Sequence, residues 1–454
     1  MRQFVWAGSC FVWACMCVWA GEGAAPEKPS LETLIRQLSD DAFEVREAAE
    51  TELGKRGEEA RAAVVAGLSH EDPEVRQRCR RIDRMLIAKH AEAAYVEAVH
   101  AHWPKNLESG RLTGPLLGAV LRNEAEGEAS KAGAGRSAMA WNATDFGFTD
   151  MKGLQDSDGH WDAMRLGAER PADVDLTALT LLSYLGSGHT EKVGAYKLIV
   201  RSSVGWLIER QREDGAVRMA GWTQVDGVSH ALAGLALAEA SGMARVPETK
   251  VAAQRAVDYA LAGHLVVKDG QPFGFSRVPL AVQPDLFTTT LFVMHLKSAK
   301  VAGLAVKPEA FEGAIRFLDA VEHKESKRYA WIPGGKPSVQ ASFMACLARQ
   351  FMGSKKEELL PYAEAALADF AGPTTGQAES DELTNWIGTL VLFQQGGELW
   401  KTWNEKLKGS LCSEQGKANA GKSGQWSGCG AGFASSLNAL CLEVYYRYLP
   451  LLKD

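Results

Sequence analysis

Apolar residues recur three or four positions apart along two stretches of this chain, residues 31–90 and 141–454. Such spacing places apolar side chains on one face of an α-helix. Four groups in the longer stretch illustrate the pattern: Ala178, Leu181, Leu182 and Leu185; Phe287, Leu291 and Met294; Phe311, Ile315 and Leu318; and Leu437, Leu440, Cys441 and Val444. The alternating patterns typical of strands are sparse, so an all-α fold is predicted.

Residues with small, hydroxyl or imidazole side chains begin the predicted helices at intervals of roughly fifty residues. They are Thr177, His230, Thr289, Ser342, Thr389 and Ser436. An interval of this length holds two helices and the turns that join them. Six such hairpins fit a closed ring of six inner and six outer helices, which we predict for residues 141–454.

Residues 31–90 contain a shorter repeat, in which residues 40–46 match residues 70–76 thirty positions later. Each copy begins with acidic residues that suit a helix N-terminus, and Pro73 suits a first helical turn. Apolar stripes lie beside the copies: Leu31, Leu34, Ile35 and Leu38, then Val64, Val65 and Leu68. The Asp-x-Glu-Val-Arg pattern resembles HEAT-type helical repeats. The resemblance implies a small helical module whose charged face is either solvated or binds a protein partner.

The first twenty residues have the character of a secretory signal peptide. Arg2 precedes an apolar run from Phe4 to Trp19, and small residues follow it. We expect residues 1–20 to be removed, residues 21–30 to form a spacer, and the protein to be periplasmic or extracellular. An uncleaved membrane anchor is the alternative, because the run is near the lower length limit for spanning a bilayer. A connecting helix and a Gly-rich linker are predicted over residues 91–140.

Charge and cysteine content narrow the classes of function. The net charge of -6 provides no basic face for nucleic acid. Five cysteines follow the leader, and this odd number excludes a fully paired disulfide framework. Cys412 and Cys429 flank a Gly-rich segment and either pair or stay reduced, whereas the other three fit buried apolar positions: Cys79, Cys346 and Cys441. Because no Cys-x-x-Cys or His-x-x-x-His spacing occurs, neither a metal nor a cofactor is predicted.

Gly-aromatic turns precede several predicted helices and carry a more specific resemblance. Gln155, Gly159 and Trp161 form one copy, Trp206, Gln211 and Gly215 a second, and residues 424–426 a third. These turns resemble the Gln-Trp motifs of the squalene cyclase and protein prenyltransferase superfamily. A Gln amide can satisfy backbone groups at helix ends, and Gly permits the tight turn. Val217 departs from the motif, which places Trp there. The resemblance implies an α/α toroid over residues 141–454.

The segment from Asp173 to Ala178 carries the candidate chemistry. It looks like the Asp-x-Asp-Asp-Thr-Ala motif of class II terpene cyclases, which implies that Asp175 is the general acid and that Asp173 polarises it. Leu176 replaces the third acidic residue of that motif. The cation formed needs aromatic walls, for which the candidates are Phe287, Phe292, Trp331, Phe343 and Trp386. The alternative is structural: both aspartates are expected to cap the N-terminus of an inner helix.

Two classes of function therefore stay open. The leading expectation is an exported binding or scaffolding module without cyclase activity, whose partner is a protein or an apolar ligand in the toroid cavity. The rival is an enzyme, either a terpene cyclase-like isomerase that uses Asp175 or a polysaccharide-processing enzyme. Acids and bases for the latter are available at His230, Asp226, Asp285, Tyr329 and His323. A membrane contact is expected only through an uncleaved N-terminal segment.

Overall fold

A computed structural model describes the chain as two compact units, Met1–Leu86 and Ile87–Asp454. The residues it describes are 28–83, 85–86, 151–168, 171–370, 382–418 and 431–444. The predicted leader, the linker over residues 91–140, the turn at residues 424–426 and Cys429, one partner of the possible Cys412–Cys429 pair, lie outside the part described. Among the described helices, none is both long enough and apolar enough to cross a membrane.

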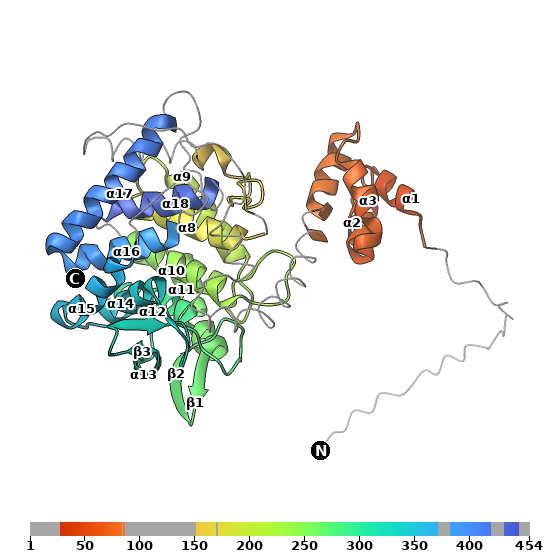
Figure 1. The fold of residues 1–454 in the computed structure, drawn as a ribbon. Helices are drawn as coiled ribbons and strands as arrows, with labels where there is room; N and C mark the ends of the chain where they lie inside the picture. Colours follow the sequence, from red (N-terminus) through yellow and green to blue (C-terminus); the bar gives the residue numbers. More distant parts are fainter. Residues whose placement is uncertain are drawn as a thin grey trace, which may run out of the picture. The chain divides into compact units, whose positions relative to one another are not determined.

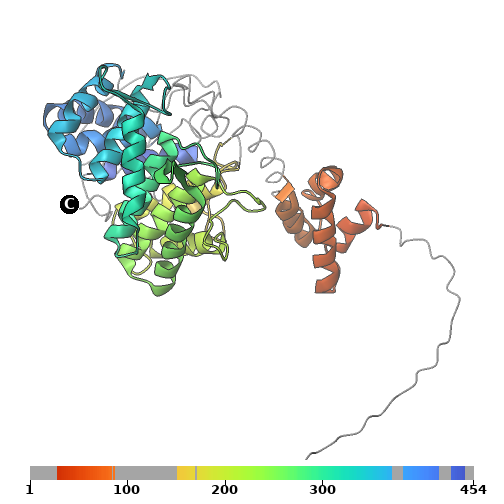
Figure 2. The ribbon, with the colours of Figure 1, turned by 90° about the horizontal axis from the view of Figure 1, so that it is seen from below.

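The N-terminal unit is a small helical module (Figure 2). It contains α1 (Leu31–Gln37), α2 (Phe43–Arg56), α3 (Glu58–Gly67) and a helix that begins at residue 73. Its core residues are Leu34, Leu38, Ala49, Leu53, Ala60, Val64, Val75, Cys79, Ile82 and Leu86. The predicted stripes therefore face the core, with the exception of Val65, which is 48% exposed.

The thirty-residue repeat of this module is also a repeat of hydrogen bonds. Arg46 donates through Nη1 to the carbonyl oxygens of residues 40 and 41, the turn that precedes α2. Arg76 makes the same two bonds, 2.7 and 2.8 Å long, to the carbonyl oxygens of residues 70 and 71. Both arginines thus hold the turn before their own helix in place, which explains why this residue type recurs at this spacing.

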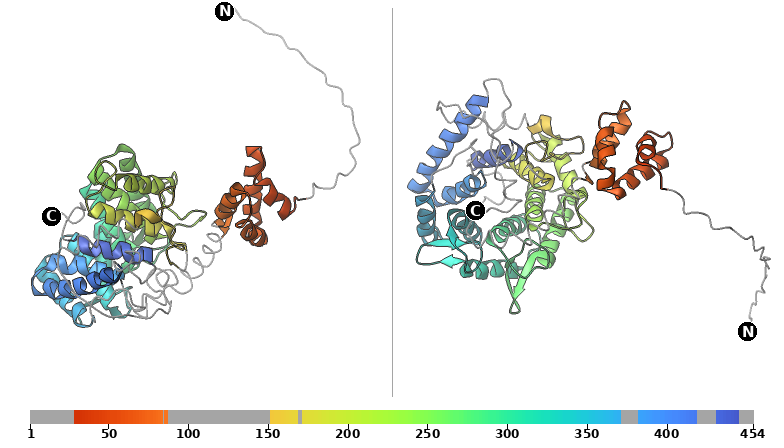
Figure 3. Two further views of the ribbon diagram at one scale, coloured as in Figure 1. Left: turned by 90° about the horizontal axis from the view of Figure 1, so that it is seen from above. Right: turned by 45° about the vertical axis from the view of Figure 1, so that its right-hand side comes forward.

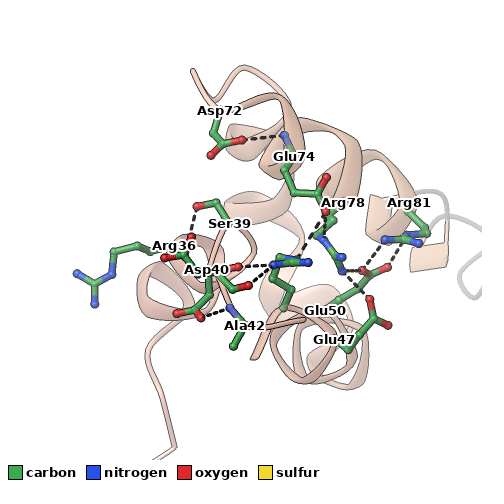
Figure 4. A network of polar contacts seen from close by, with 12 residues as sticks. Arg36, Ser39, Asp40, Ala42, Glu47, Glu50, Asp72, Glu74, Arg78 and Arg81 are labelled. Atoms are coloured by element: carbon green, nitrogen blue, oxygen red, sulfur yellow. Dashed lines mark hydrogen bonds and ion pairs between the residues drawn. The ribbon is translucent and has the colours of Figure 1, made fainter. Parts of the chain in front are cut away.

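Arg78 joins the two copies of the repeat (Figure 4). Its guanidinium is almost fully buried and donates to Glu47 and Glu50 of α2, at 2.8 and 2.7 Å, and to Glu74 at 2.6 Å. Arg81 reaches Glu50 from the solvent side at 2.6 Å. A buried guanidinium needs such partners because its charge has left water, so the network fixes the packing of α2 on the helix that begins at residue 73.

The second unit is a closed ring of helices, which confirms the predicted α/α toroid (Figures 1 and 3). Each inner helix packs on the next, and the last packs on the first. The inner helices are α8 (Asp173–Gly186), α10 (Gly227–Ala244), α12 (Leu286–Val301), α14 (Val339–Phe351), α16 (Glu382–Gln395) and α18 (Ala431–Glu443). The outer helices described are α9 (Lys197–Glu209), α11 (Pro247–Tyr259), α13 (Pro308–Ala320), α15 (Lys356–Ala368) and α17 (Gly397–Ala418).

Short antiparallel strands form in two of the turns between an outer and an inner helix. A π-helical turn (Ala260–His264) follows α11 and leads into the hairpin of β1 (Leu265–Lys268) and β2 (Gln271–Phe275). The next turn holds β3 (Glu322–His323), β4 (Arg328–Ala330) and β5 (Pro337–Ser338), in the order β3-β4-β5. These strands have two to five residues, too few for an alternating pattern to be recognised in the sequence.

Two glutamine side chains clamp the turns in the way their motif implies. Gln155 Nε2 donates to the carbonyl oxygens of Gly159, at 2.9 Å, and of Ile199 in α9, at 3.2 Å. Gln211 Nε2 donates to the carbonyl oxygens of Gly215, at 3.1 Å, and of Ala252 in α11, at 2.9 Å. In each case one amide group ties a Gly turn to the following outer helix.

A second hydrogen bond ties each turn to its inner helix, and it occurs in four consecutive hairpins. The backbone N–H of a fully buried turn residue donates to a polar side chain in the first turns of the inner helix. The pairs are Trp161 with Thr177, Val217 with His230, Phe275 with Thr289, and Tyr329 with Ser342, at 3.0 to 3.2 Å. These acceptors are four of the six predicted helix openings.

The remaining two predicted openings have other roles. Thr389 Oγ1 accepts from the indole N–H of Trp403 in α17 at 2.9 Å. Ser436 Oγ is 2.8 Å from Thr180 Oγ1 of α8, a contact across the seam at which the last inner helix meets the first. Thr389 is the eighth residue of α16 and Ser436 the sixth of α18, and the residues directly before both helices lie outside the described part.

We expect Gly215→Ala to destabilise the toroid far more than Gly303→Ala. Both glycines have positive φ, 96° and 79°, which costs about 1 kcal/mol or more for alanine. Only at Gly215 does the added Cβ meet backbone, 2.2 Å from the carbonyl oxygen of Arg255 in α11, whereas nothing lies within 4 Å at Gly303. Urea unfolding should show a loss of about 3 kcal/mol or more at Gly215. Equal losses in the two variants would contradict the close approach of turn and outer helix.

Candidate functional site

A depression lies among the inner helices of the toroid. Residues of α8, α10, α12, α16 and α18, together with Arg277 from the β2–α12 connection, line this depression. The lining residues are Asp175, Leu179, Val228, Leu232, Arg277, Phe287, Leu291, Leu383, Trp386, Phe433 and Leu437. Apart from Asp175 and Arg277, every one of them is apolar.

Asp175 is the one acidic group among the lining residues that the structure describes. It lies in the first turn of α8 and is 5% exposed, and its Oδ1 atom has no hydrogen-bond partner. No side chain caps the N-terminus of α8. The predicted role of Asp175 as a helix cap is therefore wrong. In the third position of the helix, its carboxyl turns toward the ring interior rather than back onto the preceding N–H groups.

Burial controls the protonation of Asp175. Removal from water disfavours the carboxylate, and this effect, with the negative charge of Asp226, raises the pKa of Asp175 to about 7. A hydrogen bond from Ser229 and the charge of Arg277 act in the opposite direction and are weaker. Near neutral pH the site thus holds a carboxylic acid that keeps its proton in a large share of the molecules.

Asp226 and Arg277 form a buried ion pair beside this acid. Arg277 donates through Nε and Nη2 to the two oxygens of Asp226, both at 2.9 Å, and each side chain is 3% exposed. Asp226 is also the N-cap of α10, since Oδ1 accepts from the N–H of Val228 at 3.1 Å. A further bond, from the N–H of Gly227 to the carbonyl oxygen of Arg277 at 2.8 Å, holds the two backbones together.

Asp173 has a different position from its neighbour. Its Oδ1 accepts the N–H of Ala163 at 2.9 Å, which fixes the segment before α8. It does not line the depression, but its charge adds to the rise in the pKa of Asp175. Of the two aspartates predicted as site residues, one lines the depression and the other shapes the chain beside it.

The predicted aromatic walls divide into two groups. Phe287 and Trp386 line the depression, as does Phe433, which the sequence reasoning did not single out. Three others are fully buried in the helix packing: Phe292, Trp331 and Phe343. Phe433 lies four positions before Leu437, on the apolar face predicted for α18, and this helical spacing is the sequence signal that points to it.

The remaining candidate acids and bases are engaged in separate structural contacts. Asp285 caps α12 by accepting from the N–H and the hydroxyl of Thr288, both at 2.8 Å. Tyr329 Oη accepts from Arg349 Nε at 2.8 Å, and His323 Nε2 lies 3.1 Å from the carbonyl oxygen of Gly335. They do not converge on one site, so a catalytic constellation for polysaccharide chemistry is not assembled from them.

His230 belongs to a cluster of three buried histidines. Its Nδ1 accepts the N–H of Val217, so Nε2 carries the proton and donates to the carbonyl oxygen of Ala256 at 3.0 Å. The rings of His264 and His295 lie 5.7 and 6.2 Å from it. Burial lowers the pKa of all three, to about 3 for His230 and His295 and about 4 for His264. They are neutral core residues.

No group of three or more possible ligands that could hold a metal ion occurs among the described residues. The donors nearest the depression are Asp175, whose partner group is a neutral hydroxyl, and Asp226, whose oxygens are occupied by Arg277. What the arrangement offers is one carboxyl group within an apolar wall.

Comparison with solved structures places this ring among α/α toroids. It is similar to a family 76 glycoside hydrolase from a bovine Bacteroides thetaiotaomicron strain (10% identity, 68% of this chain and 78% of that chain, TM-score 0.52). A family 76 mannosidase and a family 76 α-mannanase of Bacteroides thetaiotaomicron have TM-scores of 0.50, at 13% and 10% identity. They cover 68% and 67% of this chain and 99% and 94% of their own. At such identity the likeness shows the fold alone. Neither a family model nor a curated protein matches the sequence.

We expect Asp175→Asn to stabilise the toroid increasingly as the pH rises. The folded-state pKa of Asp175 lies above its ordinary value of 3.8, so its contribution to stability is fully present below that value and is lost as the pH rises toward about 7. The loss amounts to about 4 kcal/mol. Urea unfolding at pH 4 and pH 7.5 should show the gain of the variant over the wild type growing by about this amount.

The control is Gln271→Asn, at the exposed start of β2, which changes no titratable group. Its effect should be the same at both pH values. A gain for Asp175→Asn that is the same at both would contradict the burial of a protonated carboxyl.

Proposed function

We propose that the toroid binds an apolar small molecule in its central depression and that Asp175 is the polar group that contacts it. The observation that carries the proposal is the lining, in which leucine, valine and aromatic side chains from five inner helices surround a single carboxyl group. Ligand sites with mainly apolar walls and a few placed polar groups favour ligands of the same composition. An isoprenoid or an acyl chain is such a ligand, because it is mainly apolar and carries one polar end.

The same lining argues against a carbohydrate in this position. Glycoside hydrolysis commonly uses two carboxyl groups on opposite sides of the scissile bond. Among the described lining residues Asp175 is the one carboxyl group, and Asp226 close by is held by Arg277. Sugars also require many hydrogen bonds, which aliphatic walls do not supply. The solved toroids named above share the ring, and their substrates are not transferred to this chain.

Titration with farnesol, a neutral isoprenoid alcohol, tests the proposal. We expect one molecule to bind per chain, and Leu437→Trp, which fills the depression from α18, to weaken binding at least about tenfold. The matched control is Leu360→Trp, at a partly exposed position on α15, which should bind as the wild type does. Mannobiose serves as the carbohydrate probe. Binding of mannobiose but not farnesol, or farnesol binding unaffected by Leu437→Trp, would overturn the proposal.

Acid catalysis at the same site is a second candidate function, favoured by the position of the Asp175 carboxyl group beside the aromatic side chains of the lining. Because its raised pKa makes Asp175 a weak acid, the step requires a ligand whose cation stabilises the carboxylate that is left behind. A carboxylic acid in an apolar site can transfer its proton to the double bond of an isoprenoid. The alkene electrons form the new C–H bond, the carboxylate is left behind, and the cation is stabilised by the faces of Phe287, Trp386 and Phe433. Loss of a proton at the end of the sequence returns the carboxyl group to its neutral state, so the net reaction is an isomerisation.

Incubation with linear isoprenoids, followed by analysis of the extracted lipids, tests this second candidate. We expect a cyclised isomer of unchanged mass that is absent with Asp175→Asn. The variant preserves the size of the side chain but has no acidic proton. Product formation by Asp175→Asn would show that another group is the acid. If the wild type binds the isoprenoid but forms no product, the toroid is a binding protein and the second candidate function is wrong.

We further propose that the toroid is related to the squalene cyclase-like superfamily and that the protein is exported. Support for the first comes from the Gln155 and Gln211 turns, which make the same pair of bonds in successive hairpins. Support for the second comes from the apolar run of residues 4–19. The repeated arginine turns of the N-terminal module are consistent with a HEAT-like adaptor that binds a protein partner.

A further inference from the structure

The carboxyl groups of Asp175 and Asp226 and the guanidinium of Arg277 meet beside the depression. The two carboxyl groups accept different numbers of hydrogen bonds. Asp226 accepts three: two from Arg277 and one from the N–H of Val228. Asp175 is equally removed from water, yet its Oδ1 atom has no partner and Ser229 is its hydrogen-bonding neighbour. Donors stabilise a carboxylate, and their absence stabilises the acid.

We propose that Asp226 and Arg277 act as a positioning pair that reserves a proton on Asp175 for the ligand. By binding Asp226 with both of its facing N–H groups, Arg277 directs its charge to that carboxyl group rather than to Asp175. The Asp226 carboxylate then opposes a second negative charge close by. One carboxyl group is thus fixed as the charged member of the set and the other as the neutral acid.

Backbone hydrogen bonds hold Asp226 and Arg277 in these positions. Asp226 precedes the first residue of α10, where its side chain must accept the N–H of Val228, so it cannot turn toward Asp175 without uncapping the helix. Arg277 is fixed by the bond between its own carbonyl oxygen and the N–H of Gly227. A side chain at Gly227 would lie 2.9 Å from that oxygen, so glycine permits the close approach.

The charged groups that act on Asp175 come from three elements. Asp226 lies before α10, Arg277 lies between β2 and α12, and Asp173 lies two residues earlier in α8. Asp173 and Asp226 both favour the neutral form of Asp175, and only Arg277 favours the charged form. Removing the charge of Asp226 while Arg277 is retained should therefore lower the pKa of Asp175.

The test is a pH titration of Asp175 in the ligand-free protein. The infrared C=O stretch of its carboxylic acid reports the protonated fraction at each pH, and the midpoint is the pH at which half of it is lost. The difference between the wild type and Asp175→Asn identifies the band. In Asp226→Asn, which retains a side chain able to cap α10, we expect the midpoint to fall by at least about one pH unit, because Arg277 then acts on Asp175 alone.

Asp285→Asn is the matched control, since Asp285 caps α12 as Asp226 caps α10. It should leave the midpoint unchanged, which separates a general effect of losing a buried cap from the effect proposed here. An unchanged midpoint in folded Asp226→Asn, or an equal fall in Asp285→Asn, would overturn the proposal. If Asp226→Asn does not fold, Asp226→Ser, whose hydroxyl can also cap α10, takes its place, and an unchanged midpoint there contradicts the proposal.

This inference rests on the proposed function only in assigning Asp175 to a ligand site. The titration is measured without ligand, whereas the proposed function is tested by farnesol binding. A normal titration without binding would refute the function and leave the positioning pair intact. Farnesol binding together with an unchanged midpoint in Asp226→Asn would support the proposed function and refute the positioning pair.

Discussion

The hydrogen bond between a turn and its inner helix is the interaction on which the ring depends. In four hairpins the N–H of a buried residue before the inner helix needs an acceptor, because a buried backbone N–H costs free energy if left unpaired. A hydroxyl or imidazole in the first turns of the inner helix accepts it. The start of each inner helix is thereby placed at a fixed point relative to its turn, and the helices enter the ring in register.

The position of the candidate site follows from that register. Because the inner helices start at corresponding points, residues from their first turns approach one another, among them Asp175, Val228, Phe287 and Phe433. Turn residues reach the same region, and Arg277 is the example. The glutamine clamps act on the other side of each turn, where they bind the outer helix. Architecture and site therefore have a common origin in the turns.

The sequence was sufficient to predict the ring because periodic patterns depend on local geometry. Apolar faces at helical spacing indicated the helices, and Thr177, His230, Thr289 and Ser342 indicated where four of them begin. The orientation of Asp175 was not predictable in this way. A carboxyl group in a first helical turn caps the helix or faces inward according to its neighbours in space, and these are Asp226 and Arg277, fifty or more residues away. Arg277 carries no motif, since its role exists only once α10 and the β2–α12 connection meet.

Likeness of fold does not by itself establish likeness of site. The solved toroids with similar rings include glycoside hydrolases, yet the lining here has the composition of a site for an apolar molecule. A ring of helix hairpins is a scaffold whose centre is rebuilt by changing side chains that do not affect the turns. The buried histidines illustrate the converse: chemically versatile groups can serve packing alone.

Photolabelling with a farnesol analogue that carries a diazirine tests the central claim most directly, because it reports where an apolar ligand lies. The account predicts labels on inner-helix peptides that contain Phe287, Trp386 or Leu437, and their loss in Leu437→Trp. Labels confined to exposed aliphatic positions such as Leu280 and Val282, which are 82% and 86% exposed, and equal in the wild type and Leu437→Trp, would contradict it.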